Sequence, residues 1–483
     1  MSTLQKHKHI FIGILLCILA NVIIPPVNGL TPAGVRTIGV FLMICYWWIF
    51  VAVDWPSVLA IPLFAIAGAN TVNGLLSASF GSYIFVFPLV SMLVSSVLIE
   101  EGFFSRFINW FISRKTLKGK SYKFLCFYFF ALYIMSMFVD LMPAMIITNP
   151  LSRSVCDELG YKKGEKFTTA VFLGSMWTLL LGYGSTPISH NVPVTVVGLL
   201  EQATGATISY IDYMMVAIPC TLLLFILMLI IFRIFLNPDN TKFQAYDPEA
   251  HRTTEKLSLR GKIAAFIFLG MVAFILGPSL ISPIAPTLAK TISSFGIVTP
   301  AIIAMALMCI IHVDGKPVLN FKTAVPKVSW GVLFICVGML VASSALNNTD
   351  NTGIVTVVTN LVQPVVSGMS SWLPFVLFLL VWILVQTNFM SCFLTANMAM
   401  LVAMPICAGL AGLVNPYAVG ILIAIFANIG VLTPAASNPA AFWLGCEYLD
   451  IKVGFKYGLL YVICAIVVGL FLGYPLANII FAV

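Results

Sequence analysis

Charged residues are scarce in this sequence. Asp, Glu, Lys and Arg make up 9% of its 483 residues, whereas 60% of the residues are hydrophobic. A soluble domain carries about 25% charged residues, so water is not the main solvent of this chain. Its apolar stretches reach the roughly 17–25 residues that a bilayer crossing needs. The composition therefore disfavours a soluble enzyme or binding module and indicates a polytopic membrane protein.

Several chemical signatures are also missing. No cysteine pair has CxxC spacing, and the eleven cysteines are scattered through apolar segments, so we interpret them as small core residues. HExxH, GxSxG and Asp-rich clusters are absent, which disfavours an integral-membrane enzyme. No zinc-finger, helix-turn-helix or RNA-binding pattern occurs, so the net charge of +8 does not indicate a nucleic-acid partner.

The basic residues lie in short loops between apolar segments. If the N-terminus is cytoplasmic, only Arg36 and Lys290 of the 25 Lys and Arg residues fall outside. We therefore predict a multi-pass protein of the cell (cytoplasmic) membrane with a cytoplasmic N-terminus. This count requires the long apolar blocks 124–151 and 372–410 to enter and leave on one side, as re-entrant hairpins. The Glu100-Glu101 pair, beside basic residues at a helix end, is interpreted as a solvated face.

A polar segment divides the chain into halves with the same rhythm. We predict an all-α membrane protein with about 11 transmembrane helices and two re-entrant hairpins in two inverted repeats. The expected spans are 10–24, 39–53, 56–69, 83–97, 170–181 (with a polar extension to 199), 213–235, 263–280, 297–311, 328–342, 418–444 (broken) and 457–483, with amphipathic stretches at 103–112 and 354–366. The expected units are first-repeat scaffold helices (1–121), a first-repeat transport unit (122–236), a cytoplasmic linker (237–261), second-repeat scaffold helices (262–370) and a second-repeat transport unit (371–483).

Two polar interruptions occur in each half. The first long block places Ser136, Asp140 and Pro150 at the same spacing as Ser391, Thr395 and Pro405 in the second. The segment after each block carries Thr-Pro with Asn five residues after the Thr: Thr186, Pro187 and Asn191, then Thr433, Pro434 and Asn438. Proline breaks a helix, and Ser, Thr and Asn compete for its backbone groups. Such breaks are tolerated in a bilayer only where they are buried or line a watery cavity, and their helix ends bind ions.

At these residues the chain resembles the divalent anion/sodium symporter family of the wider ion-transporter superfamily. The resemblance implies two inverted repeats, an elevator-type mechanism, a homodimer, and binding of substrate and coupling ion at hairpin tips, the second being Thr395-Ala396-Asn397. The expected substrate-binding residues are Asp140, Thr186, Pro187, Asn191, Thr395, Asn397, Thr433, Pro434 and Asn438. The expected ion-coupling residues are Ser136, Asp140, His190, Ser391, Thr395 and Asn397, with sodium expected at all of these except His190.

Asp140 is the acidic residue that we place deep in the membrane, and His190 is the histidine at similar depth. A charge there costs about 2.5–3.5 kcal/mol, so Asp140 needs a partner or a wet cavity. An ion pair or proton-binding pair with His190 suits proton coupling, because imidazole titrates near neutral pH. The alternatives are a structural hydrogen-bonded pair, or an Asp140 that faces the cytoplasmic vestibule.

Together these features predict a secondary active transporter for a small anion, favouring a di- or tricarboxylate. Coupling to sodium or protons, or exchange, is left open, and no cofactor other than the coupling ion is expected. The expected partners are the anionic solute, the lipid bilayer and a second copy of the chain. The alternatives are a cation/proton antiporter of the same superfamily and an integral-membrane enzyme.

Overall fold

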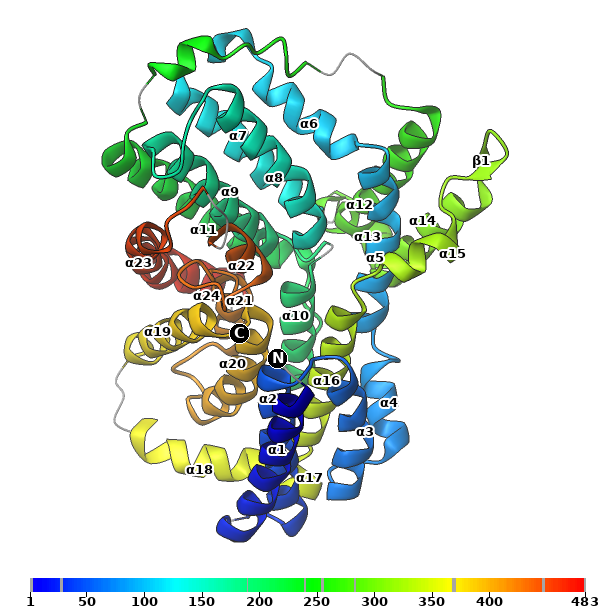
Figure 1. Cartoon of the computed structure of the whole chain (residues 1–483). Coiled ribbons are helices and arrows are strands. Elements are labelled where there is room, and N and C mark those ends of the chain that lie inside the picture. Colours follow the sequence, from blue (N-terminus) through cyan, green and yellow to red (C-terminus); the bar gives the residue numbers. More distant parts are fainter. Residues whose placement is uncertain are drawn as a thin grey trace.

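The computed structural model describes residues 3–26, 29–188, 190–238, 240–252, 256–281, 284–366, 371–444 and 448–481, and these are mostly helical (Figure 1). In the first half the elements are α1 (Thr3–Ile23), α2 (Pro32–Phe50), α3 (Trp55–Ala67), α4 (Val72–Ser79), α5 (Tyr83–Glu100), α6 (Phe103–Ile112), η1 (Lys115–Leu117), α7 (Ser121–Ser136), α8 (Leu141–Glu158), α9 (Lys166–Ser185), α10 (Asn191–Thr204), α11 (Tyr210–Ile231), η2 (Phe232–Leu236) and η3 (Lys242–Ala245). In the second half they are α12 (Leu259–Ile281), α13 (Pro286–Ser293), α14 (Val298–Ile310), β1 (His312–Val313), β2 (Lys316–Pro317), α15 (Phe321–Ala324), η4 (Val325–Lys327), α16 (Trp330–Leu346), α17 (Thr349–Thr352), α18 (Ile354–Val366), α19 (Leu373–Phe389), α20 (Cys392–Gly409), α21 (Pro416–Phe426), α22 (Asn438–Leu444), α23 (Ile451–Val468), η5 (Gly469–Gly473) and α24 (Tyr474–Ile480).

Seven of the described helices are long and apolar enough to cross a bilayer, or eight if the bent pair α13 and α14 forms one span. Six shorter apolar helices accompany them, among them α7, α19 and α21. The membrane-protein class is thereby confirmed. The number of crossings and the re-entrant path of the hairpins remain predictions, because the long blocks divide into helices shorter than or close to the bilayer thickness.

The order of elements repeats between the halves. α5, α6, the pair α7 and α8, the pair α9 and α10, and α11 correspond in order to α16, α18, the pair α19 and α20, the pair α21 and α22, and α23. The halves interlock, because α10 packs against α20 and α21 while α22 packs against α8 and α9. In Figure 1, α6 and α18 lie toward opposite ends of the molecule.

Several short elements were not predicted, among them α4, α13, β1 and β2. α4 begins where the Thr71 hydroxyl accepts the Gly74 N–H, and α13 is another eight-residue helix. β1 and β2 form a two-residue hairpin, a small departure from the all-α prediction. Its turn is Asp314-Gly315, and both residues have positive φ, as a tight hairpin turn requires. Helices and strands this short bury too few residues to leave a periodic signal.

The centre of the molecule is α9, which is buried from Phe167 to Ser185. Glycine allows α7 to approach it closely, since a Cβ at Gly182 would lie 1.8 Å from the Ser136 hydroxyl oxygen. Ser136 is fully buried, and its hydroxyl donates to the Tyr133 carbonyl at 3.0 Å. The end of α7 is thus fixed against α9 beside the break between α9 and α10.

The polar linker, residues 237–261, packs against α6 and the start of α9. Tyr246 is buried, and its hydroxyl donates to the Ile112 carbonyl at 2.9 Å. The Lys242 ammonium donates to the Glu165 carboxylate at 2.6 Å, which holds the pKa of that carboxyl below its usual value. A lowered pKa stabilises the fold at neutral pH, and the effect fades as pH falls through that pKa. Solvent screens this exposed pair, so its contribution is small.

Candidate functional site

The tip of the first hairpin is the segment between α7 and α8. Asp140 is the N-cap residue of α8, with extended backbone (φ −61°, ψ 153°), and its side chain makes no capping hydrogen bond. α8 begins here because Pro143 stands in its first turn, where no backbone donor is needed. Asp140 is 8% exposed and is the one buried Asp or Glu among the described residues.

The tip of the second hairpin lies four residues earlier than predicted. α19 ends at Phe389, and Ser391 is the N-cap residue of α20. Thr395 and Asn397 therefore lie inside the first turns of α20, fully buried, and not at the tip. The Thr395 N–H bonds the Ser391 carbonyl at 2.9 Å, as in a regular first turn. Ser391 itself is exposed.

A matching hydrogen bond ties each Thr-Pro loop to its hairpin. The Thr186 hydroxyl donates to the Met137 carbonyl, and the Thr433 hydroxyl donates to the Asn388 carbonyl, both at 2.5 Å. Met137 lies three residues before Asp140, and Asn388 lies three residues before Ser391. The structural equivalent of Asp140 is therefore Ser391, and the predicted pairing of Ser136 with Ser391 is wrong by one helical turn.

The remaining predicted site residues lie in or beside these loops. Pro187 is buried, whereas Pro434 is exposed. Asn191 begins α10 and is 1% exposed. Asn438 begins α22, but its side chain lies outside the described part of the structure.

Asn388 supports the second broken segment and was missed by the sequence interpretation. Its amide group donates to the Ile429 carbonyl at 3.0 Å, and its amide oxygen accepts the N–H groups of Val431 and Leu432 at 2.7 Å. The Thr387 hydroxyl donates to the Ala427 carbonyl at 2.6 Å. These side chains thus satisfy backbone groups that the helix break leaves without helical partners. Three successive polar residues, Gln386-Thr387-Asn388, at the end of an apolar run were the available signal.

Three helix N-termini converge near Tyr183, a second residue that sequence reasoning missed. The buried Tyr183 hydroxyl accepts the Asn191 N–H at the start of α10, at 3.2 Å. Asp140 at the start of α8 lies within electrostatic range of both the Tyr183 phenol and the Cys392 thiol at the start of α20. A helix N-terminus carries about half a positive elementary charge. The arrangement therefore favours an anionic group, as at other helix N-termini.

Buried oxygens without partners occur at the starts of α10 and α20 and just after α21. Within the described residues, the Thr395 hydroxyl and the amide oxygens of Asn191, Asn397 and Asn428 make no hydrogen bond. The amide groups of Asn397 and Asn428 donate to their own helices, at 2.6 and 2.7 Å, which leaves each oxygen as the unused atom. An unpaired buried polar atom lowers the free energy of unfolding by about 1–3 kcal/mol, so a ligand that bonded to these oxygens would recover that energy. Oxygen donors suit a hard cation.

The predicted pairing of Asp140 with His190 does not form an ion pair in the described structure. The His190 Nε2 atom lies 2.6 Å from the Ser136 carbonyl oxygen, and its ring lies against Tyr183, with centroids 4.2 Å apart. Asp140 instead lines a small cavity of about 70 Å³ shared with α5 and the segment before α16. Ser95, Ser96 and Lys327 also line it.

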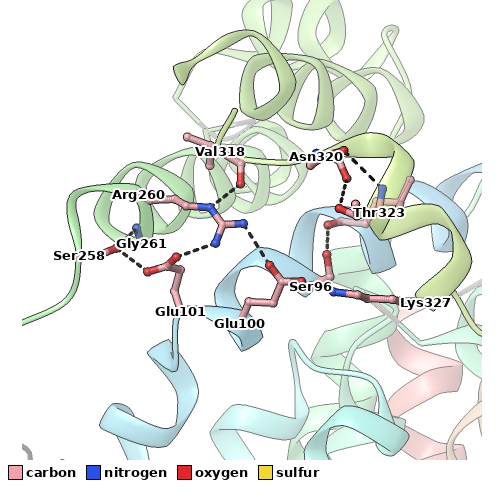
Figure 2. A network of polar contacts seen from close by, with 11 residues as sticks. Ser96, Glu100, Glu101, Ser258, Arg260, Gly261, Val318, Asn320, Thr323 and Lys327 are labelled. Atoms are coloured by element: carbon pink, nitrogen blue, oxygen red, sulfur yellow. Dashed lines mark hydrogen bonds and ion pairs between the residues drawn. The ribbon is translucent and has the colours of Figure 1, made fainter. Parts of the chain in front are cut away.

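Glu100 is exposed, in line with the expected solvated face, and the Glu100-Glu101 pair in addition belongs to an ion network (Figure 2). Arg260 bridges the two carboxylates, at 3.1 Å from Glu100 and 2.7 Å from Glu101, and donates to the Val318 carbonyl at 2.8 Å. Lys327 pairs with Glu100 at 2.7 Å. The network thus joins α5, α12 and η4 next to the cavity that Asp140 lines.

Comparisons with known proteins show which family and fold the chain shares. The model of the citrate transporter family matches residues 40–385. The sodium-dependent dicarboxylate transporter SdcS of Staphylococcus saprophyticus is 24% identical over 97% of this chain and 92% of its own. The L-tartrate/succinate antiporter of Escherichia coli is 26% identical over 63% of this chain and 57% of its own. The crystal structure of the Alcanivorax borkumensis YdaH transporter shares the fold, with a TM-score of 0.54 at 15% identity over 88% of this chain and 96% of that one.

Proposed function

The chain belongs to the citrate transporter family, and from this premise we propose that it carries a small di- or tricarboxylate across the cytoplasmic membrane by secondary active transport. The observation that carries the proposal is the convergence of the N-termini of α8, α10 and α20 near Tyr183. Helix N-termini bind carboxylates through backbone N–H groups, without a buried Lys or Arg. The dicarboxylate substrates named for the two relatives support the same class of solute.

We further propose sodium as the coupling ion. The unused oxygens of Thr395, Asn397 and Asn191 are neutral donors of the kind that hold a hard cation, and Asp140 supplies a buried negative charge at the start of α8. A bound cation also offsets the repulsion between Asp140 and a carboxylate substrate. The sodium dependence in the name of SdcS supports this choice.

In the proposed mechanism the transport units 122–236 and 371–483 move together against the scaffold units 1–121 and 262–370, as in an elevator. The interlocking of α10 with α20, and of α22 with α8, supports a joint movement, because the two hairpins and two broken helices form one packed body. The cavity that Asp140 shares with Ser95 and Lys327 lies at the boundary between the proposed bodies. A homodimer of scaffold units completes the proposal.

The test is uptake of labelled succinate into liposomes that contain the purified chain, with sodium and proton gradients imposed separately. We expect saturable uptake driven by the sodium gradient and inhibited by malate and citrate. Tyr183→Phe removes the acceptor that holds the start of α10, so the KM for succinate should rise roughly fivefold to tenfold. Tyr457→Phe is the matched control, since its hydroxyl makes no hydrogen bond within the described part of the structure and its ring packs against Phe235. Absence of uptake under both gradients and by exchange would reject a dicarboxylate substrate.

A second candidate is cation/proton antiport, which one observation favours. Asp140 is a buried carboxylate without a capping hydrogen bond, and such a group exchanges a proton for a cation readily. Sodium flux that depends on pH but needs no succinate would support it. In the same assay, an unchanged pH profile for His190→Gln would remove His190 from proton coupling.

A further inference from the structure

A basic pocket lies apart from the hairpins, where α6, the turn after it and the linker meet. Its volume is about 410 Å³. The linker, green in Figure 1, runs along the end of the molecule that carries α6. The lining residues are Arg106 and Trp110 from α6, Ser113, Arg114 and Lys115 from the turn, and Glu249 and Arg252 from the linker.

The charges of the lining residues do not balance. Four are cationic and one is anionic, which leaves a net charge of +3 on the described wall of the pocket. Glu249 is shared between two cations, with its oxygens 3.5 Å from the Lys115 ammonium and 3.4 Å from Arg252. One carboxylate shared in this way leaves capacity for a further anion. Arginine binds phosphate through two parallel hydrogen bonds, so a phosphate group matches this wall better than a single carboxylate does.

The lining side chains of the pocket are held in place by contacts with the rest of the protein. The Arg114 guanidinium stacks on the Trp110 ring at 3.7 Å, which fixes its plane. Arg106 donates to the Glu101 carbonyl at 2.5 Å, so its position is set by backbone. The linker wall is held in place by the buried Tyr246, whose hydroxyl bonds the last residue of α6.

The pocket also lies on an amphipathic helix. α6 buries Phe104, Ile108 and Ile112 on one face and presents Arg106 and Trp110 on the other, with Trp110 56% exposed. Tryptophan and arginine on such a face are typical of the headgroup level of a bilayer. Basic pockets at this level bind anionic lipid headgroups.

We propose that this pocket binds the phosphate group of an anionic phospholipid and thereby clamps the linker to α6. The proposal uses residues outside the transport site and does not depend on which solute is carried. The same phosphate chemistry occurs in soluble phosphate, so the test must distinguish the two sources.

The test uses the purified full chain in phosphatidylcholine nanodiscs with increasing fractions of phosphatidylglycerol, and binding is read by native mass spectrometry and by Trp fluorescence. Lys115→Gln with Arg252→Gln removes two cations that are 85% and 67% exposed, so the fold should survive. Retention of phosphatidylglycerol should fall roughly tenfold or more. The matched control is Lys162→Gln with Lys163→Gln, exposed lysines of another loop with the same change of charge. It should bind as the unaltered chain does.

Glu249→Gln should have the opposite effect: it removes the one carboxylate among the described residues of the wall, so lipid retention should rise. Arg114→Gln is the second loss-of-charge variant and should weaken retention without Lys115 or Arg252 being changed. Equal losses in the pocket and control variants would overturn the proposal, as would an unchanged Glu249→Gln. Millimolar inorganic phosphate that displaces the lipid completely would assign the pocket to soluble phosphate and overturn the lipid assignment.

Discussion

At the scale of single residues, the site is defined by side chains that the helix breaks leave with unused atoms. Asp140 stands at a helix N-terminus without capping it, and Thr395 and Asn397 keep unused oxygens inside α20. Burying such atoms is costly unless a ligand completes them. Atoms of this kind also occur inside regular helices, as at Ser91 and Thr168, so those of the site are distinguished by their place at the helix starts that adjoin the breaks.

Asp140→Asn tests whether the charge of Asp140 takes part in sodium coupling. The variant keeps the size of the side chain but removes its charge, so stimulation of succinate uptake by sodium should fall roughly tenfold. Asp350→Asn, an exposed change on α17, is the control and should leave sodium dependence unaltered. Sodium dependence is measured as the ratio of initial rates with and without the gradient. An unaltered ratio for Asp140→Asn would mean that Asp140 faces the vestibule and takes no part in coupling.

Asn388→Ala tests the support of the broken segment. It leaves the N–H groups of Val431 and Leu432 and the Ile429 carbonyl without their partner, so the free energy of unfolding should fall by at least about 2 kcal/mol. Asn21→Ala is the control, because this exposed amide bonds only within its own helix and its loss should cost under about 0.5 kcal/mol. Thermal unfolding in detergent measures both. Equal shifts in the two variants would contradict the assigned role.

At the scale of elements, the sequence predicts which helices exist better than it predicts which residues of the two repeats correspond to each other. The bounds predicted for the amphipathic stretches 103–112 and 354–366 are those of α6 and α18, and the long apolar blocks divide near their polar residues as expected. The pairing of Ser136 with Ser391 failed because it matched residue types at equal spacing. The true register is set by tertiary hydrogen bonds from Thr186 and Thr433, which no local pattern contains.

The same reasoning separates the predicted site residues from the missed ones. Thr186 and Thr433 were found because Thr-Pro is itself a break signal. Tyr183 resembles any other aromatic residue of an apolar helix until α10 is packed against it, and Asn388 acquires its role only from the loop that it binds. The linker gave no sign of the buried Tyr246 that docks it, because one aromatic residue makes no periodic pattern.

Arg260→Ala tests the network that joins α5, α12 and η4. It leaves Glu100 with Lys327 as its remaining partner and removes the donor to the Val318 carbonyl, so unfolding free energy should fall by about 1–3 kcal/mol. The loss should shrink as salt is raised, because these charges are partly exposed. Arg252→Ala, whose pairing spans a single turn, should cost under about 0.5 kcal/mol. A salt-independent loss would assign the effect to packing of the guanidinium instead.

At the scale of the whole molecule, the two halves interlock and neither encloses its own breaks. α10 is covered by α20 and α21, and α22 is covered by α8 and α9. A separated half would expose its helix breaks and their backbone groups to lipid, which a bilayer does not tolerate. We therefore expect chains 1–252 and 256–483 to aggregate when expressed singly and to assemble when expressed together.

A chain that is cleaved after it has folded should behave differently from halves that are made separately. If a protease site is inserted between Arg252 and Lys256 and cleaved after purification, the halves should stay together on size exclusion and keep succinate uptake within about twofold, because packing and not the linker holds them. Halves purified singly and then mixed should give no uptake, since an aggregated half no longer offers its packing faces. A soluble, helical single half would contradict the interlocked arrangement. Dissociation of the cleaved chain would instead assign the cohesion of the halves to the covalent linker.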